Sequence, residues 1–206
     1  MKQLKIGILA YHGDVEEHLE AAKNAAKKLK QNIEVIPVRI KEDIINLAGL
    51  IIPGGESTTL YKLCQREGIF EQIKQVKNIF GTCAGAIMLA KTVDNKTPDQ
   101  KTLELMDIEI DRNAYGRQND SFETEIKTEL GNIKAVFIRA PRIKSVGKNI
   151  KVLAKNQDEV IACEQRINGN YYLALCFHPE LTTTIFHEYF IKKIAGTFNL
   201  ILTLDS

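Results

Sequence analysis

The chain has 206 residues, of which 44% are hydrophobic and 26% are charged, and its formal net charge is +2. These values are ordinary for one globular domain, and the small net charge gives no reason to expect nucleic-acid or membrane binding. No apolar run reaches the roughly 20 residues that span a bilayer, and the N-terminus lacks the long apolar core of a signal peptide. We therefore expect a single domain over residues 1–206 that stays in the cytosol.

The first ninety residues predict strands that alternate with helices. Apolar runs predict strands at residues 4–10, 33–38, 49–52 and 78–81. Helical patterns fall at residues 15–30, 41–47, 57–67 and 72–77. Asp14, and Ser57 or Thr58, are expected to cap the helices that begin beside them. This alternation is typical of an α/β fold, with a doubly wound, mainly parallel sheet flanked by helices as in flavodoxin-like proteins, and ligands there bind beyond the carboxyl ends of the strands.

The second half has a different pattern, with short strands separated by turn signals such as Asn168-Gly169-Asn170. The expected strands are residues 107–111, 122–127, 134–138, 152–154, 160–164 and 171–177. This pattern predicts an antiparallel extension of the parallel sheet. A final helix is expected from residue 184 to about residue 196.

Cys83 stands in Gly81-Thr82-Cys83-Ala84-Gly85, between an apolar run and a helix-forming run. Small residues on both sides allow a sharp turn from strand to helix, as in a nucleophile elbow, with a thiol where related hydrolases carry serine. An inert buried thiol at a tight turn is the alternative. The other cysteines lack the close spacing of metal ligands and are expected in the core: Cys64, Cys163 and Cys176.

His178 and Glu180 follow the apolar run at 172–177, so they also fall at a strand end. Pro179 restrains His178 to extended geometry, in which residues two apart point the same way. Glu180 can then reach one imidazole nitrogen while the other nitrogen faces Cys83. In this arrangement Cys83 attacks a carbonyl carbon, His178 transfers the proton and Glu180 orients the imidazole. An ordinary exposed carboxylate at Glu180 is the alternative.

The loop Pro53-Gly54-Gly55 follows another predicted strand on the same rim. A tetrahedral intermediate needs hydrogen-bond donors aimed at its oxyanion. The backbone N–H of Ala84 is one natural donor, and Gly55 is the candidate for the second because glycine permits close backbone approach. A plain strand-to-helix turn is the alternative, and the lysine and spacing of a phosphate-binding P-loop are absent.

Five segments in this order resemble the glutaminase subunits of pyridoxal 5′-phosphate synthase, which are class I glutamine amidotransferases. They are Gly54-Gly55-Glu56-Ser57-Thr58-Thr59, Phe80-Gly81-Thr82-Cys83-Ala84-Gly85, Arg112-Asn113-Ala114-Tyr115-Gly116-Arg117-Gln118, Phe137-Ile138-Arg139-Ala140-Pro141 and Phe177-His178-Pro179-Glu180-Leu181-Thr182. The cysteine and His-Pro-Glu motifs are shared by class I amidotransferases generally. The Gly-Gly-Glu-Ser, Gly-Arg-Gln and Ile-Arg-Ala-Pro segments narrow the resemblance to the glutaminase subunits of pyridoxal 5′-phosphate synthase. It covers nearly the whole chain.

The resemblance implies hydrolysis of L-glutamine to L-glutamate and ammonia, and delivery of the ammonia to a separate synthase subunit for pyridoxal 5′-phosphate (vitamin B6) biosynthesis. It also implies that Cys83, His178 and Glu180 form the catalytic triad, without a metal or an organic cofactor. The residues implied to bind glutamine are Gly55, Glu56, Ser57, Arg117, Ile138 and Arg139. A surface ion pair is the alternative for Arg117 and Arg139.

One departure from the family pattern lies at Tyr11-His12-Gly13, where many members read Leu-Gln-Gly. A role for the glutamine side chain is therefore in doubt here, whereas a role of the backbone at this position is still expected, and an exposed loop residue is the alternative for His12. Three other functions remain as alternatives: a glutaminase that serves another biosynthetic pathway, a non-catalytic binding or chaperone-like protein on the same scaffold, and a peptidase, which the charged glutamine-sized site implied by the resemblance disfavours.

Overall fold

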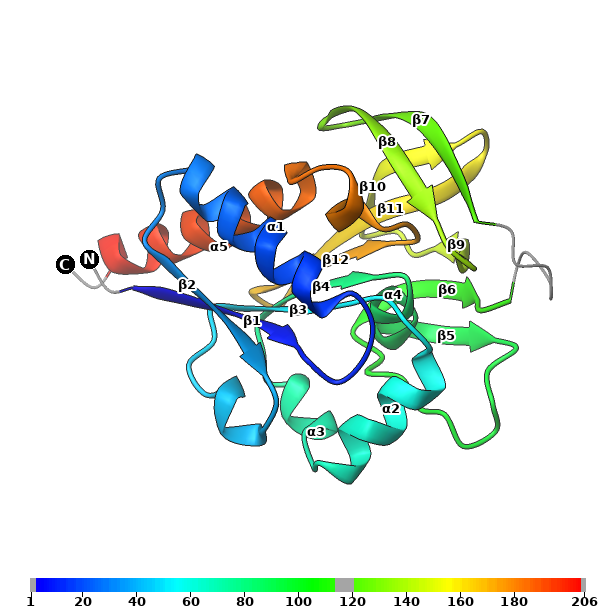
Figure 1. The fold of residues 1–206 in the computed structure, drawn as a ribbon, viewed down its shortest axis with the longest axis horizontal. Helices are drawn as coiled ribbons and strands as arrows, with labels where there is room; N and C mark the ends of the chain where they lie inside the picture. Colours follow the sequence, from blue (N-terminus) through cyan, green and yellow to red (C-terminus); the bar gives the residue numbers. More distant parts are fainter. Residues whose placement is uncertain (1–2, 114–120, 205–206) are drawn as a thin grey trace.

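The computed structural model describes residues 3–113 and 121–204, with side chains placed as far as Gly196. One continuous mixed sheet runs through this part of the chain, and helices cover both faces of its parallel half (Figure 1). This architecture confirms the α/β fold class with a mainly parallel sheet in the first half and an antiparallel extension in the second.

Five neighbouring strands make the parallel half, in the order β2-β1-β3-β4-β12. They are β1 (Leu4–Leu9), β2 (Ile33–Val38), β3 (Gly49–Ile52), β4 (Asn78–Thr82) and β12 (Asn170–Leu175). Their sequences are nearly continuous apolar runs because both faces of a parallel sheet are buried.

The helices form a layer on each side of these strands. On one side, α1 (Val15–Lys28) packs against α5 (Ile185–Leu204) (Figure 1). The other side carries the 3₁₀ helix η1 (Lys41–Ile44), α2 (Ser57–Arg66), α3 (Phe70–Ile73) and the short α4 (Ala84–Leu89). The core therefore lies in two layers, one above and one below the parallel strands.

The antiparallel half begins beside β12 and continues through β11 (Glu159–Ile167), β10 (Ile150–Asn156), β7 (Phe122–Thr128) and β8 (Gly131–Phe137). A branch of three strands leaves this path, because β9 (Arg142–Val146) pairs with both β11 and β6 (Met106–Asp111). The last strand of the branch, β5 (Ala90–Asp94), pairs with β6 in parallel. Asn168 and Gly169 both have positive φ angles at the β11–β12 turn, as a tight hairpin requires.

Several local expectations were wrong. The helix placed at 72–77 lies at Phe70–Ile73, and strands β5 and β9 were not expected. Asp14 occupies the N-cap position of α1 but makes no capping hydrogen bond with its side chain. The side chain of Glu56, and not that of Ser57 or Thr58, caps α2. The final helix continues beyond residue 196 to Leu204.

Across residues 3–113 and 121–204, none of the helices combines the length and the apolar character needed to cross a bilayer.

Candidate active site

Cys83 lies at the turn from β4 into α4 and is held in an unusual backbone conformation. Its φ of 48° and ψ of −103° lie outside the regions that non-glycine residues normally adopt, and such strain is characteristic of functional turns. A Cβ atom at Gly85 would lie 2.1 Å from the Ile52 carbonyl oxygen, so only glycine fits where the turn meets β3. The expected elbow is therefore present.

A pocket of about 330 Å³ opens beside Cys83, beyond the carboxyl ends of the parallel strands. It lies at the small end of the range usual for ligand sites. Among the residues predicted for the site, the pocket lining includes Gly55, Glu56, Ser57, Cys83, Ile138, Arg139 and His178. The lining residues that the sequence did not single out as pocket residues are Gly13, Asp14, Ile87, Arg112 and Asn113. His12 is an exposed loop residue that also lines the pocket.

His178 follows β12, and a hydrogen bond from its backbone N–H to the Val136 carbonyl (2.9 Å) ties it to β8. Its Nδ1 atom lies 2.8 Å from Glu180 Oε1 and 3.0 Å from Asp14 Oδ2. Its Nε2 atom is buried and has no hydrogen-bond partner within the described ranges. Nδ1–H is thus shared by two carboxylates, while Nε2 remains available on the side of the thiol.

The contact between His178 and Glu180 was predicted, but its geometry differs from the expected extended segment. His178 is close to extended, with φ of −106° and ψ of 84°, and a 3₁₀ turn, η2 (Pro179–Leu181), follows at once. This turn carries the Glu180 side chain back onto the imidazole. The side chain is 0% exposed, so the alternative of an ordinary surface carboxylate is wrong.

His178 and its two carboxylate neighbours shift one another's pKa values. Burial alone would lower the pKa of His178, but its contacts with Asp14, Cys83 and Glu180 outweigh burial and raise that pKa above its ordinary value. The hydrogen bond from His178 lowers the pKa of Asp14. Burial raises the pKa of Glu180, and the hydrogen bond from His178 offsets part of this rise. The arrangement stabilises an imidazolium between carboxylates, next to a thiol.

The Cys83 thiol also has a neighbour on the opposite wall of the pocket, because its Sγ atom donates to the Ile138 carbonyl at 3.9 Å. The next residue, Arg139, is exposed and has a φ of 44°, so a second strained turn faces the elbow. The Ile138 carbonyl, from the second half of the chain, therefore lies against the cysteine.

The glycine loop after β3 comes close enough to touch the imidazole. A Cβ atom at Gly54 would lie 2.4 Å from His178 Cε1, so glycine is required for the two segments to meet. Gly55 lines the pocket. Ala84 is the first residue of α4, where a backbone N–H has no partner within its own helix. The two backbone groups expected to bind an oxyanion thus belong to segments that both reach the pocket beside Cys83.

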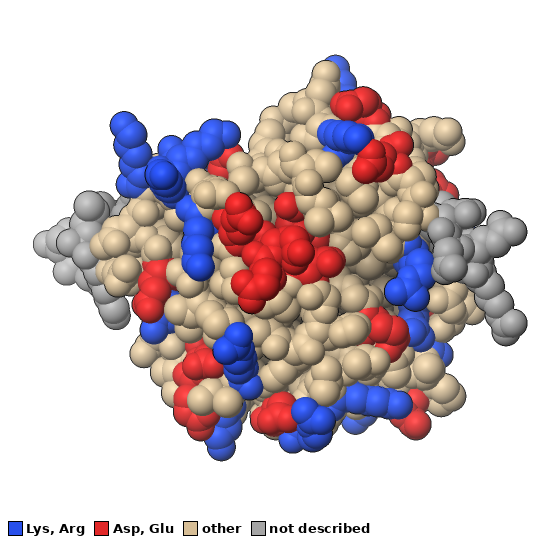
Figure 2. All heavy atoms as spheres, in the orientation of Figure 1, with Lys and Arg blue, Asp and Glu red and all other residues tan. Residues whose placement is uncertain are grey.

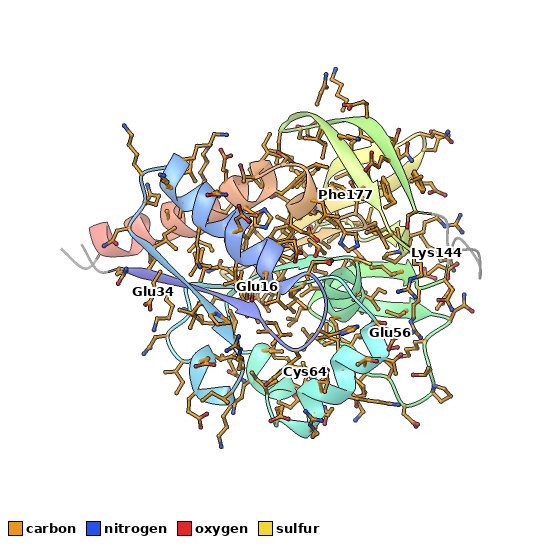
Figure 3. The ribbon with its side chains drawn as sticks, in the orientation of Figure 1. Glu16, Glu34, Glu56, Cys64, Lys144 and Phe177 are labelled. Atoms are coloured by element: carbon orange, nitrogen blue, oxygen red, sulfur yellow. The ribbon has the colours of Figure 1, made fainter. Side chains whose placement is uncertain are left out.

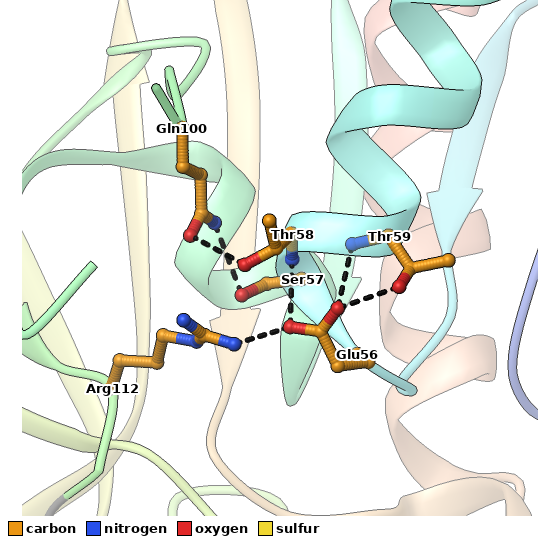
Figure 4. Close-up of polar contacts among 6 residues, drawn as sticks. All are labelled: Glu56, Ser57, Thr58, Thr59, Gln100 and Arg112. Carbon is orange, nitrogen blue, oxygen red and sulfur yellow. Dashed lines mark hydrogen bonds and ion pairs between the residues drawn. The ribbon is translucent and has the colours of Figure 1, made fainter. Parts of the chain in front are cut away.

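Glu56 is held by a network at the start of α2 (Figure 4). Its carboxylate accepts from the backbone N–H groups of Thr58 (2.9 Å) and Thr59 (2.7 Å), and it pairs with Arg112. Burial opposes the charge, yet these hydrogen bonds and the Arg112 guanidinium lower the pKa of Glu56 to about 2. Glu56 is therefore a fixed anion that anchors Arg112 in the pocket wall. Behind it, Gln100 bridges the hydroxyl groups of Ser57 and Thr58.

Arg117, predicted to bind glutamine, lies outside the described residues. Arg112, at the start of the same motif, lines the pocket and was missed as a site residue. The sequence did hold a signal for Arg112, because this residue directly follows β6 and begins a motif that had already been singled out. In Figure 3, Glu56 lies at the start of α2, and Phe177, the neighbour of His178, lies beside β12.

Residues 8–196 match the model of the SNO glutamine amidotransferase family. The chain belongs to this family. The pyridoxal 5′-phosphate synthase subunit PdxT of Pyrococcus horikoshii is 46% identical over 93% of this chain and 100% of its own length. The PdxT subunit of Methanosarcina barkeri is also 46% identical, over 93% of this chain and 98% of its own.

Solved structures agree with this assignment. A glutamine amidotransferase of known crystal structure is 40% identical, with a TM-score of 0.77, and the match covers 93% of this chain and 98% of that one. A GH42 β-galactosidase shares the fold with a TM-score of 0.57 at only 13% identity, and the match covers 96% of this chain and 30% of that one. The β-galactosidase likeness shows the fold alone.

The amidotransferase contains three further buried or half-buried groups near the site that sequence reasoning did not assign to it. Asp14 was expected only as a helix cap, and its carboxylate contacts His178 instead. His18 and His187 are each 0% exposed and lie behind Glu180. His18 follows Asp14 by one helical turn, which is a signal of a shared face, but His187 has no local signal because its contact spans 169 positions of sequence.

Proposed function

We propose that this amidotransferase is the glutamine-hydrolysing subunit of a pyridoxal 5′-phosphate synthase, with Cys83, His178 and Glu180 as its catalytic triad. The observation that carries the proposal is the strained Cys83 at the mouth of a small pocket, next to an imidazole whose other nitrogen is held by Glu180 at 2.8 Å. The names of the PdxT relatives, at 46% identity over nearly their whole length, support the pathway.

The proposed reaction begins when the side-chain amide of glutamine lies over Cys83. The sulfur attacks the amide carbon as its proton passes to His178 Nε2, and the carbonyl electrons move onto oxygen. The N–H groups of Ala84 and Gly55 stabilise this oxyanion. The intermediate collapses, ammonia leaves with the proton from His178, and a γ-glutamyl thioester remains. Water then attacks the thioester with His178 as base, which releases glutamate and restores the thiol.

The substrate's charged groups find counterparts in the pocket wall. Arg112, anchored by Glu56, and the exposed Arg139 offer cations for the α-carboxylate. Backbone groups near Ile138 and the Ser57 segment complete the proposed glutamine site, and Gly55 contributes to both the wall and the oxyanion site. Neither a metal nor an organic cofactor takes part in this scheme.

We further propose that residues 1–206 act as one amidotransferase domain, since one continuous sheet links both halves of the described chain. The ammonia is delivered to a separate synthase subunit in a hetero-oligomeric complex. A partner that seats on the rim can favour the orientation of the Gly54–Gly55 peptide that presents its N–H to the oxyanion.

The test measures ammonia release from glutamine by the full chain, with and without the synthase subunit, and with Cys83→Ala in parallel. We expect glutaminase activity that depends on Cys83 and rises in the complex. One oxyanion donor contributes roughly 10²–10³ in rate, which sets the largest stimulation expected. Absence of ammonia release in the complex would overturn the proposed function. Equal rates with and without the partner would overturn only its regulatory part.

A further inference from the structure

Two histidines lie behind the proposed triad, out of reach of the pocket. His18 on α1 and His187 on α5 are each 0% exposed, and His18 Nδ1 lies 2.9 Å from His187 Nε2. The other nitrogen of His18, Nε2, lies 3.0 Å from Thr82 Oγ1 and 3.3 Å from Glu180 Oε2. The pair thus leads from the interface between α1 and α5 to the back of the Glu180 carboxylate.

Burying polar side chains between two packed helices costs free energy unless they are hydrogen-bonded. Burial lowers the pKa of His18 and of His187, so both rings are neutral. Apolar residues would pack the interface between two helices without this desolvation cost. Beside His18 lies Glu180 Oε2, a carboxylate oxygen that is buried and makes no well-formed hydrogen bond within the described residues. A carboxylate oxygen in that position requires a donor.

The tautomers follow from this requirement. A neutral imidazole offers one donor and one acceptor. With the proton on Nε2, His18 faces Glu180 Oε2 and Thr82 Oγ1 as a donor, and its Nδ1 accepts from His187 Nε2–H. The only unpaired atom of the pair is then the lone pair of His187 Nδ1. The opposite tautomers would set a lone pair of His18 against the carboxylate and leave a buried N–H of His187 unpaired, which costs more.

We propose that His18 and His187 are positioning residues of the thiol site, forming a buried donor chain that runs from His187 Nε2–H through His18 to Glu180 Oε2 and holds this carboxylate against His178. The inference rests on the proposed function in one respect, that Glu180 orients His178 during catalysis. The donor chain holds Glu180 Oε2, while His178 Nδ1–H donates to Glu180 Oε1 at 2.8 Å. Outer hydrogen-bond partners of this kind orient an active-site group and keep it ionised.

The charged and titratable groups around Glu180 come from four directions. His178 and Asp14 lie on the pocket side, and His18 lies behind. The exposed glutamates of the first turns of α1 lie in the acidic patch at the centre of the face in Figure 2, and Glu17 and Glu20 line a surface hollow that also reaches residue 180. Glu188 neighbours His187 from α5. Lys28 pairs with Glu188. A hydrogen bond to a carboxylate favours its charged form, so loss of the donor from His18 raises the pKa of Glu180.

The first test compares His18→Leu with wild type in glutamine hydrolysis, using the full chain together with the synthase subunit. Loss of the donor should lower kcat/KM by roughly 10–100-fold, the range found for the outer hydrogen-bond partners of metal-binding side chains. The acid limb of the pH profile should move to higher pH, because Glu180 is then protonated more easily. His187→Leu, one step further back, should give a smaller change in the same direction.

The second test is rescue by a variant that keeps the donor. The amide nitrogen of His18→Gln can occupy the region of Nε2, so this variant should recover most of the rate and return the acid limb toward its wild-type position. Thermal unfolding of each variant serves as the control for folding. A loss of packing alone would lower the unfolding temperature without moving the acid limb.

The third measurement needs no variant of the histidine pair. The ¹⁵N spectra of the histidine rings in the wild-type chain should show His18 and His187 as neutral Nε2–H tautomers. An Nδ1–H tautomer at either ring, or an acid limb unchanged in folded His18→Leu, would overturn the proposal. If wild type released no ammonia, the proposed function would fail, and the ring spectra would still decide whether the donor chain exists.

Discussion

The two nitrogens of His178 face regions of opposite character. Nε2 faces Cys83 and a solvent-connected pocket that must admit glutamine and release ammonia. Nδ1 faces Glu180, a carboxylate with no exposed side-chain surface, and behind it two fully buried histidines. We call the pocket and Cys83 the open side of His178, and Glu180 with the two histidines behind it the closed side. On the open side groups can change partners during the reaction, whereas on the closed side each group has a fixed partner. This difference indicates that chemistry is confined to one side of the ring while the other side sets the orientation and charge of the ring.

The largest effect is expected from removing the nucleophile on the open side. Cys83→Ala should lower kcat by at least about 10⁴-fold, because the members of such a catalytic unit fail together. Ammonia release under saturating glutamine measures the loss. The matched control is Cys64→Ala on α2, a buried thiol labelled in Figure 3 that does not line the pocket. Loss of activity in the control, or its retention in Cys83→Ala, would contradict the comparison.

The next effect is expected on the closed side. Glu180→Gln keeps the shape but removes the charge, so His178 loses both its orientation and the stabilisation of its imidazolium form. We expect kcat/KM to fall by about 10²–10⁴-fold, the range given by outer partners and by orienting carboxylates of triads. Glu164→Gln is the control, a buried carboxylate that accepts from Tyr171 and lies outside the pocket. Equal activity of wild type and Glu180→Gln would remove Glu180 from the triad.

A smaller effect is expected from the cations of the open side. Arg112→Ala should reduce kcat/KM for glutamine by roughly 10–100-fold, which corresponds to one hydrogen bond between charged groups. The change should fall mainly on KM, because this interaction holds the substrate before and during the reaction. Arg66→Ala is the control, since Arg66 is exposed, pairs with Glu67 and lies outside the pocket. Unchanged kinetics in Arg112→Ala would assign the α-carboxylate to other groups.

The smallest effect is expected at Asp14, which joins the two sides. Its carboxylate lies 3.0 Å from His178 Nδ1 but is 34% exposed, so its contribution is closer to that of a surface ion pair, about 1 kcal/mol or roughly fivefold. Asp14 raises the pKa of His178, and its removal lowers it again. In Asp14→Asn the acid limb of kcat/KM, where His178 gains a proton and can no longer act as a base, should therefore move to lower pH. An unmoved limb would show that Glu180 alone sets the charge of the ring.

The same division explains what could be predicted from the sequence. Strands β1 to β4 were predicted to within a residue or two because parallel strands buried on both faces are read from composition alone. Cys83 and the His178–Glu180 pair were predicted because each carries its own local pattern. Strand β9 was missed because Arg142–Val146 is short and partly exposed, and its place is set by pairing with β6 and β11.

The closed side of the site was harder to predict than the open side. The role of Asp14 was misassigned because a carboxylate before a helix is usually a cap, and only the folded chain brings it to His178. The partnership of His18 with His187 depends on how α1 packs on α5, which no local pattern records. Glu56 shows the converse case, since its motif was predicted while its role as the cap of α2 and the anchor of Arg112 was not.

The most direct test of the account locates the covalent bond that the chemistry requires. The full chain is treated with an electrophilic analogue of glutamine in the presence of the synthase subunit, and the labelled peptide is identified by mass spectrometry. The account predicts one label, on Cys83, that glutamine protects against and that Cys83→Ala abolishes. A label on Cys64, Cys163 or Cys176 with Cys83 unmodified would contradict the central claim that Cys83 is the nucleophile.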